Sequence, residues 1–301
     1  HFSIPTLNSL TGPFKDRVTV LYQENLTTKM PAAFRRLGFK NIQLLKNRKV
    51  YDLTAETQIY CAQVGAGPDS CLGVLSGGQV ILNVNDCEVN GRDCAIFRRD
   101  MGADIDVVLN QFSIAGNRGL RDTDEHLKHI AATILDNVVQ NHQDLGAATT
   151  IPFASFVYFS DWDNRYMNEF ITTPREVAER FDELGLDLTV LHPGSEYMVG
   201  TSYDSTEDLL RFDKVYSSIS GLDYRKLAPV PASQICEHAV RLSQDLNERF
   251  PSLLLDRLKP LKFHLPDLNQ VIEVDLRVGT IELCEDDGDF DISIMSSALE
   301  Y

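Results

Sequence analysis

Polar side chains follow two apolar segments at the point where each segment ends. Residues 80–87, VILNVNDC, are apolar up to Asp86, and residues 104–113, DIDVVLNQFS, lead to Gln111 and Ser113. Apolar strands that stop at polar residues bring those side chains to the rim of a sheet, where active sites are commonly built. A carboxylate at the end of a buried strand is costly unless it is paired or binds a cation. Asp86 is therefore the first candidate for a catalytic or metal-binding residue, the alternative being a hydrogen-bonded turn aspartate.

Three further polar residues stand in loops that could line a site. The glycine-rich segments VGAGPDS (64–70) and AGNRG (115–119) have neither the Walker spacing nor the dinucleotide fingerprint, so we interpret them as loops whose backbone can approach a ligand closely. Asp69 in the first is a candidate ligand. Arg118 in the second could pair with an anionic substrate, since a guanidinium binds carboxylate or phosphate bidentately. His192 ends the apolar segment LTVLHPG, a position typical of a ligand or a general base.

Other clusters of polar residues have simpler explanations. His126 and His129 would share one helix face, but that face is flanked by acidic residues and is typical of a solvated surface. The acidic segment 284–291, CEDDGDFD, lacks the ligand spacing of a calcium loop and is expected to be a solvated loop. The six cysteines contain no C-x-x-C pair, which indicates reduced thiols in a cytoplasmic protein.

Composition limits the partners of this protein. Of its 301 residues 43% are hydrophobic, which is enough for a large core, and the formal net charge is −16. A strongly acidic chain argues against nucleic acid and against anionic membrane surfaces. The sequence shows no membrane span and no signal peptide. Because it begins at His1 and stops abruptly after an apolar segment, we expect the natural protein to be longer.

The pattern of apolar residues predicts an α/β protein. Residues 17–45 give strand, helix and strand in succession, and 57–86 give a meander of strands separated by glycine turns. Further elements are expected as strands at 106–113, 150–159 and 188–197, helices at 123–146, 173–185 and 234–250, and a β-hairpin at 261–283. No element is predicted for 200–225. A change in the sequence pattern near residue 228 is interpreted as a domain boundary, which divides the chain into domains 1–225 and 226–301.

With these blocks in view, the chain resembles the metallo-β-lactamase-fold superfamily. The resemblance rests on VILNVNDC, DVVLNQFSIAG, IPFASFVYFSDWDNRYMNE and LHPGSEY and covers roughly residues 1–200. It is greatest to the branch of the CMP-N-acetylneuraminate hydroxylases and the ascorbate-phosphate lactonase-like hydrolases. It implies an αββα sandwich that is incomplete at its N-terminus, with a small C-terminal α+β appendage after it.

The resemblance also implies a metal centre. The superfamily holds its metals with an H-x-H-x-D-H loop, and HFSIPTLNSL is similar to the segment directly after that loop, so that His1 matches its last histidine. Asp86 matches the metal-bridging aspartate, and Asp69 lies where a further histidine ligand is usual. Gln111 and Ser113 stand where the last histidine should come after DVVL, which puts the usual two-zinc chemistry in doubt. The implied cofactor is one or two divalent metal ions, zinc before iron.

Three functions are compatible with these residues as hypotheses. The first is a metal-dependent hydrolase that acts on a small, anionic substrate through a metal-activated water, with Asp86 as its catalytic residue and Arg118, Gln111, Ser113 and His192 contacting the substrate. The second is an iron-dependent oxygenase of the hydroxylase type. The third is a catalytically degenerate binding module. A small-molecule substrate is the expected partner, and a homo-oligomer is compatible with the sequence.

Overall fold

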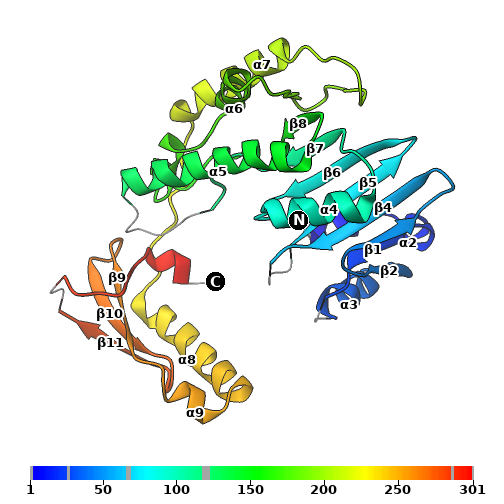
Figure 1. Ribbon diagram of the computed structural model, residues 1–301. Coiled ribbons are helices and arrows are strands. Elements are labelled where there is room, and N and C mark those ends of the chain that lie inside the picture. Colours follow the sequence, from blue (N-terminus) through cyan, green and yellow to red (C-terminus); the bar gives the residue numbers. More distant parts are fainter. Residues whose placement is uncertain (1–2, 26–27, 66–68, 117–122, 286–287, 300–301) are drawn as a thin grey trace. The chain divides into compact units, whose positions relative to one another are not determined.

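The computed structural model describes residues 3–25, 28–65, 69–116, 123–285 and 288–299 (Figure 1). Its contacts divide the chain into two compact units. Unit 1 comprises His1–Ile114, Ile130–Val157 and Thr172–Ser220, and unit 2 comprises Ala115–His129, Tyr158–Ile171 and Gly221–Tyr301. The last of these boundaries lies near the expected division after residue 225, whereas the two inner segments of unit 2 were not foreseen. Among the described helices, none combines the length and the apolar character needed to cross a bilayer.

Unit 1 is built on a six-stranded mixed sheet. Its strands lie in chain order and are β3 (Lys49–Asp52), β4 (Thr57–Gln63), β5 (Ser70–Ser76), β6 (Gln79–Asn85), β7 (Val107–Asn110) and β8 (Thr149–Pro152). β3 to β6 are antiparallel, which confirms the predicted meander, and β6, β7 and β8 are parallel. Gly77 and Gly78 both have positive φ, 59° and 80°, as a two-residue hairpin turn between β5 and β6 requires.

Two crossover helices cover one face of this sheet. α4 (Gly91–Met101) connects β6 to β7, and α5 (Asp124–Leu145) connects β7 to β8. Helical crossovers are the usual way to join parallel strands. The main core lies between helices and sheet, and its fully buried members include Tyr60, Leu82, Val84, Phe97 and Leu145. Burial of this apolar surface at about 25 cal/mol per Å² is the dominant favourable term for the unit.

The opposite face of the sheet packs against a second, smaller sheet. β1 (Thr19–Gln23) and β2 (Asn41–Leu45) are parallel and are joined by α3 (Lys29–Arg36). Leu21 and Leu45 pack on Ile59 and Cys61 of the large sheet, whereas Tyr22, the next residue of β1, lies edge-on to Phe34 of α3 with ring centroids 6.2 Å apart. Alternate side chains of β1 thus point to opposite faces. The layer order is helix, sheet, sheet, helix, which confirms the expected α/β class. Two short helices, α1 (Ile4–Ser9) and α2 (Gly12–Arg17), precede β1.

Several elements of unit 1 differ from the prediction. The expected strand 150–159 ends at Pro152 and continues as a loop, and 188–197 retains one bridge, between Leu188 and Thr150. Helix 173–185 is confirmed as α6 (Pro174–Glu183), while α7 (Thr206–Ser218) fills part of the segment without a prediction. α4 was also missed, although its capping box of Asn90 and Asp93 is a recognisable start signal.

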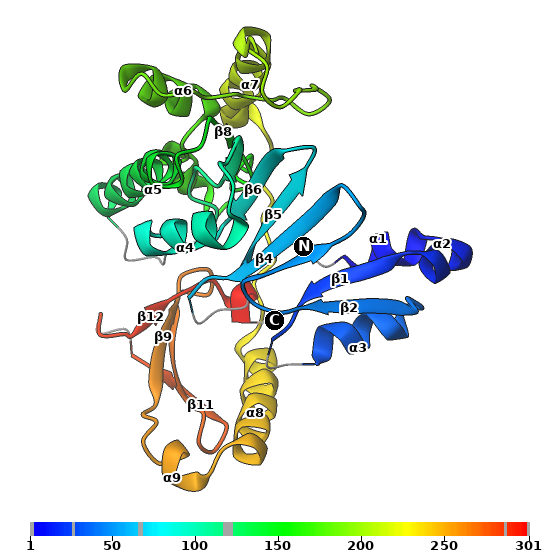
Figure 2. The ribbon, with the colours of Figure 1, turned by 45° about the vertical axis from the view of Figure 1, so that its right-hand side comes forward.

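Unit 2 contains the predicted C-terminal α+β part. The expected hairpin is a sheet of order β11-β10-β9-β12, with β9 (Leu261–Leu265), β10 (Gln270–Asp275), β11 (Thr280–Cys284) and β12 (Ile292–Ser293). α8 (Ala232–Arg249) packs on this sheet through Ile235 and Ala239 against Leu265 and Ile272 (Figure 2). α9 (Ser252–Leu255) comes after α8, and 3-10 turns occur at Arg165–Glu169, Ile219–Gly221 and Ser296–Leu299.

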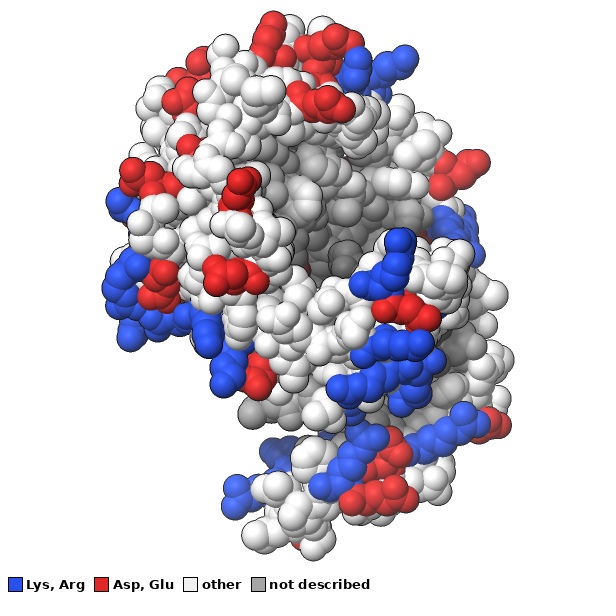
Figure 3. Space-filling view, turned by 90° about the vertical axis from the view of Figure 1, so that its right-hand side faces the viewer, with Lys and Arg blue, Asp and Glu red and all other residues white. Residues whose placement is uncertain are grey.

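Exposed charges of opposite sign are interspersed on the surface. Figure 3 shows Lys and Arg side chains beside Asp and Glu side chains over the face that it draws. Pairs such as Lys40 and Asp16, at 3.0 Å, and Arg249 and Asp245, at 2.9 Å, are largely exposed. Exposed pairs contribute little to stability, about 0–1 kcal/mol each. The charged surface therefore affects solubility more than it affects the fold.

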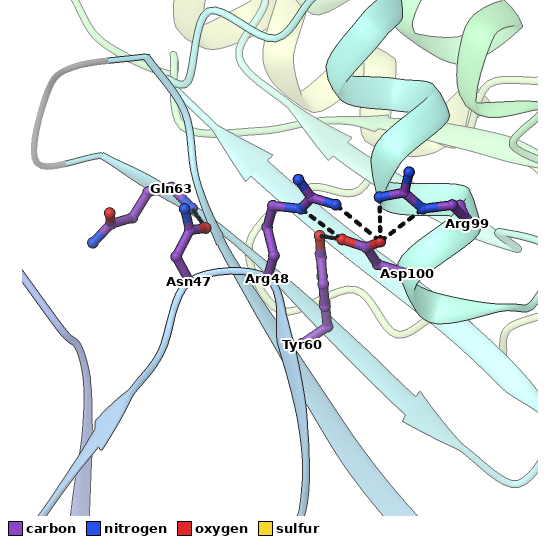
Figure 4. A network of polar contacts seen from close by, with 6 residues as sticks. All are labelled: Asn47, Arg48, Tyr60, Gln63, Arg99 and Asp100. Atoms are coloured by element: carbon purple, nitrogen blue, oxygen red, sulfur yellow. Dashed lines mark hydrogen bonds and ion pairs between the residues drawn. The ribbon is translucent and has the colours of Figure 1, made fainter.

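One partly buried carboxylate joins three elements of unit 1. Asp100 of α4 accepts hydrogen bonds from Arg48 Nε at 2.8 Å, from Arg99 Nη2 at 2.8 Å and from the Tyr60 hydroxyl at 3.1 Å (Figure 4). The Arg48 guanidinium lowers the pKa of Asp100 to about 2, and the bonds from Arg99 and Tyr60 act in the same direction while burial opposes them. The network fixes the β2–β3 connection and the buried Tyr60 to the last turn of α4.

Asp100→Asn should lower the free energy of unfolding at pH 7 by about 1–2 kcal/mol, after allowance for the solvent exposure of both arginines. The pKa of Asp100 is below the usual value of about 3.9 for an unfolded Asp, so its contribution is present above about pH 4 and is lost as the pH falls toward about 2. Urea unfolding at several pH values checks this: the difference between wild type and variant should shrink below pH 4. Asp136→Asn, which removes the exposed ion-pair partner of Arg180, is the control. It should change the free energy of unfolding little at any pH. A difference that does not depend on pH would contradict the assignment.

Candidate functional site

The ends of five strands meet at one edge of the large sheet. β6, β7 and β8 are parallel, and their last residues are in register at Asn85, Asn110 and Pro152. β4 ends and β5 begins at the same edge, since Gln63 pairs with Ser70. We call this set of positions, residues 63–64, 69–70, 85–86, 110–111 and 152–153, the carboxyl edge. Ligands of open α/β sheets bind just outside the carboxyl ends of parallel strands.

Asp86 is the first residue after β6 and is exposed. Its Oδ1 accepts a hydrogen bond of 2.7 Å from Asn85 Nδ2, and Asn85 itself has a positive φ of 49°. The bend at Asn85 coincides with a shift in the register between β6 and β7, so the chain leaves the sheet directly after Val84. The apolar segment before Asp86 predicts a buried carboxylate. In the structure Asp86 lies exposed in a turn, so it is not buried, and its role as a ligand stays a prediction beside the alternative of a hydrogen-bonded turn aspartate.

Asp69 and Gln111 lie on the two strands that flank β6. Asp69 directly precedes β5 and is exposed, and Gln111 directly follows β7 and is half-buried. Gln111 donates from Nε2 to the Ser113 carbonyl at 3.1 Å, and its backbone N–H donates to the Asn85 carbonyl at 3.0 Å. Neighbouring strands are about 4.8 Å apart, so the chain positions of Asp69, Asp86 and Gln111 are adjacent along the edge. These three predicted residues are thus brought together.

His192 lies at the same edge of the sheet, but farther from β6 than Asp69 and Gln111 are. The chain before it pairs in parallel with β8, through Leu188 and Thr150, so it is three strands away from β6, or about 14 Å. Its ring lies 4.9 Å from that of Phe212, and its Nδ1 lies 3.2 Å from the Pro193 carbonyl oxygen. Strand spacing therefore places the chain at His192 farther from Asp86 than the chain at Asp69 or Gln111.

Ser113 is fully buried, and its hydroxyl is already engaged. Its Oγ accepts a hydrogen bond of 2.8 Å from the backbone N–H of Thr172. The bond holds the start of the segment that leads into α6. Contact with a substrate therefore stays a prediction for Ser113, and we leave it out of the candidate site. His1 and Arg118 lie outside the described residues.

The described residues supply part of a metal ligand set. Among them there is no group of three or more His, Cys, Asp or Glu side chains placed to hold a metal ion. Asp69 and Asp86 nevertheless offer carboxylate oxygens on neighbouring strands, and oxygen donors suit hard divalent cations. A complete ligand set would need further donors, and the resemblance assigns one of them to His1.

Asn110 is a buried polar residue at the carboxyl edge that the sequence pattern did not single out. Its side chain is 4% exposed, and its Nδ2 finds no hydrogen-bond acceptor within the described part of the chain. A buried amide donor without a partner costs about 1–3 kcal/mol. Such groups in native proteins are often reserved for a ligand or water. Asn110 ends the apolar strand VVLN, which the sequence shows, but the missing partner of its Nδ2 is a property of packing.

An apolar wall borders this polar edge. Phe112 lies edge-on to Phe156 with ring centroids 5.3 Å apart, and Phe156 stacks on Phe212 at 4.7 Å. Phe153 and Phe156 remain 37% and 38% exposed. Ala154 between them has φ of 61°, a strained value for a residue other than glycine, and strain of this kind is concentrated at functional sites. Polar donors next to exposed aromatic rings are typical of small-molecule sites.

Comparisons with known proteins found matches among solved structures only. Neither a protein-family model nor a curated protein matches the chain. The similar solved structures include an isothiocyanate hydrolase from Delia radicum gut bacteria, with 15% identity, a TM-score of 0.43 and coverage of 62% of this chain and 69% of that one. The metallo-beta-lactamase fold protein YhfI from Bacillus subtilis has 8% identity, a TM-score of 0.42 and coverage of 65% and 74%.

A third similar structure is CmlA, a diiron beta-hydroxylase from Streptomyces venezuelae, with 11% identity and a TM-score of 0.41. The match covers 58% of this chain, which spans 38% of the hydroxylase. All three TM-scores are below 0.5, so the assignment of the site rests on its own geometry.

Asn110→Leu should leave the protein as stable as the wild type or slightly more stable, because it removes a buried donor that has no partner and keeps a similar volume. If the amide serves a ligand, turnover or ligand binding should fall at least about tenfold. Thermal unfolding and hydrolysis of small esters, lactones and phosphorylated compounds check both parts. Asn168→Leu is the matched control. The Asn168 side chain accepts from the Phe159 N–H at 2.7 Å and donates to the Phe159 carbonyl at 3.0 Å, so its loss should destabilise. A clear loss of stability in Asn110→Leu would contradict the reserved role.

Proposed function

We propose that this protein is a metal-dependent hydrolase that acts on a small-molecule substrate at the carboxyl edge. The proposal is supported by two observations: the chain positions of Asp69, Asp86, Asn110 and Gln111 lie at neighbouring strand ends, and Asn110 Nδ2 has no hydrogen-bond partner among the described residues. Four polar groups at neighbouring strand ends, beside an exposed aromatic wall, are the composition of a substrate site rather than of a packed strand end.

Each residue has a distinct role in this proposal. Asp86 and Asp69 would hold the cation, and the resemblance assigns a further donor to His1. A bound divalent cation lowers the pKa of a water molecule and polarises a substrate oxygen. The amides of Asn110 and Gln111 orient the substrate by donating to its oxygen atoms, and Phe156 excludes water from one side. Arg118 would select an anionic group on the substrate.

A catalytically inactive binding module is the second candidate. It is favoured by the incomplete ligand set among the described residues. In that case the carboxyl edge would still bind a small molecule through Asn110 and the aromatic wall. Metal analysis of the purified protein separates the candidates, because the binding module needs no stoichiometric metal, and iron rather than zinc would favour an oxygenase.

The proposal predicts that Asp86→Asn lowers both bound metal and hydrolysis. We expect at least about a 100-fold loss of kcat/KM on a panel of small esters, lactones and phosphorylated compounds, because both metal binding and the activated water depend on the carboxylate. Asp104→Asn is the matched control, since Asp104 is also exposed but lies before β7 at the opposite edge, and it should leave both quantities unchanged. Full metal content and full turnover in Asp86→Asn would refute the assignment.

A further inference from the structure

A hollow in unit 1 lies at the edge of the large sheet opposite the carboxyl edge. It has a volume of ≈ 310 Å³, and its walls come from the residues before β7, from the start of β8, and from two parts of the segment between α6 and α7, residues 187–189 and 197–203. Small-molecule sites begin at about 300 Å³, so this volume suits a ligand about the size of one sugar ring. Because it lies at the amino ends of β7 and β8, it is separate from the carboxyl edge.

Most of the residues that line this hollow carry carboxylates, hydroxyls or tyrosine rings, and Ala148, Leu188 and Gly200 complete the lining. Asp106 and Asp187 supply two carboxylates, and Thr149, Thr189, Thr201 and Ser202 supply hydroxyls. No Lys or Arg is found among its described lining residues. The local charge is therefore negative, which favours a neutral or positively charged ligand and disfavours an anion.

Two tyrosines form an aromatic corner in the hollow. Tyr197 and Tyr203 meet edge to face, with ring centroids 5.8 Å apart and an angle of 82° between the rings. An aromatic face presents an apolar surface with negative potential, which attracts C–H groups of positive character and ammonium groups. Polyols carry apolar C–H faces between hydroxyl groups, so a corner of this kind next to carboxylate acceptors matches their alternating surface.

The loop that supplies both tyrosines is held in place at three points. Asp208 of α7, which is 4% exposed, accepts hydrogen bonds from Ser195 Oγ at 2.6 Å and from the Tyr203 hydroxyl at 2.5 Å. Burial alone would raise the pKa of Asp208, but these bonds and one from the His192 backbone lower it, so the carboxylate stays charged. Gln79 Nε2 donates to the Val199 carbonyl at 2.7 Å. A wall fixed in this way needs little ordering when a ligand binds.

We propose that this hollow is a binding site for a monosaccharide-sized polyol, with preference for an amine-bearing sugar. The carboxylates of Asp106 and Asp187 accept from hydroxyl or ammonium groups, and the ring of Tyr197 covers a C–H face of the sugar. The site does not depend on the proposed hydrolysis, since it shares no residue with the carboxyl edge.

Isothermal titration of the purified protein with glucosamine, glucose and glucuronate tests this proposal. We expect saturable one-to-one binding, with glucosamine at least as tight as glucose and glucuronate weakest. Asp187→Asn should reduce the advantage of glucosamine over glucose by about two- to fivefold, the effect of one partly exposed charge pair. Tyr197→Ala should weaken both sugars. Glu196→Gln, an exposed carboxylate on the same loop that does not line the hollow, should change nothing.

Two results would overturn the proposal. One is the absence of binding for all three sugars by wild-type protein whose thermal unfolding is cooperative. The other is binding of glucuronate as tight as that of glucose, because the two carboxylates must disfavour an anion. A variant that does not fold is recognised by the absence of cooperative thermal unfolding. In that case the relative affinities of the wild-type protein for the three sugars test the proposal.

Discussion

The parallel pairing of β6, β7 and β8 is the constraint on which the rest of unit 1 depends. The buried residues of these strands are mostly apolar, such as Leu82, Val84 and Val108, and the few polar ones among them include Thr150 and Asn110. Polar groups that the chain needs therefore stand mostly where the strands end. Because parallel strands all end at the same side, Asp86, Asn110 and Gln111 are gathered there by the backbone hydrogen bonds alone.

The two edges of the sheet differ in character for the same reason. At the carboxyl edge the chain leaves the strands through the bends at Asn85 and Ala154, and exposed aromatic rings border the polar groups. At the opposite edge, where β7 and β8 begin, the chain arrives from α4 and α5. The loop before α7 lines the hollow there together with Thr149. One edge therefore presents strained backbone and an unpartnered amide, and the other presents a hollow whose wall is fixed by Asp208. The two sites that we propose on this sheet therefore differ in chemistry.

The sequence predicted the strands and much of the carboxyl edge, and the failures have physical causes. The apolar segments separated by glycine turns predicted β4 to β6 correctly. Asp86 was chosen as a candidate site residue because it follows an apolar strand. The expected strand 150–159 is too long, because most apolar residues after Pro152 are exposed in a loop. Their hydrophobicity predicted a strand, but this part of the chain does not pair with a neighbouring strand. The role of His192 stays a prediction, and its distance from β6 depends on the strand order, which composition does not reveal. The unpartnered Nδ2 of Asn110 is a property of packing and has no sequence signal of its own.

The most direct test of the central claim is where a divalent cation binds. Paramagnetic Mn²⁺ broadens the NMR signals of nearby nuclei, so its titration into isotope-labelled protein would map the site. We predict that the amide signals of Ser70, Asp86 and Gln111 broaden first and together. Broadening that begins instead at the acidic segment 284–291, or at Asp106 and Asp187, with these three signals unaffected, would contradict a cation site at the carboxyl edge.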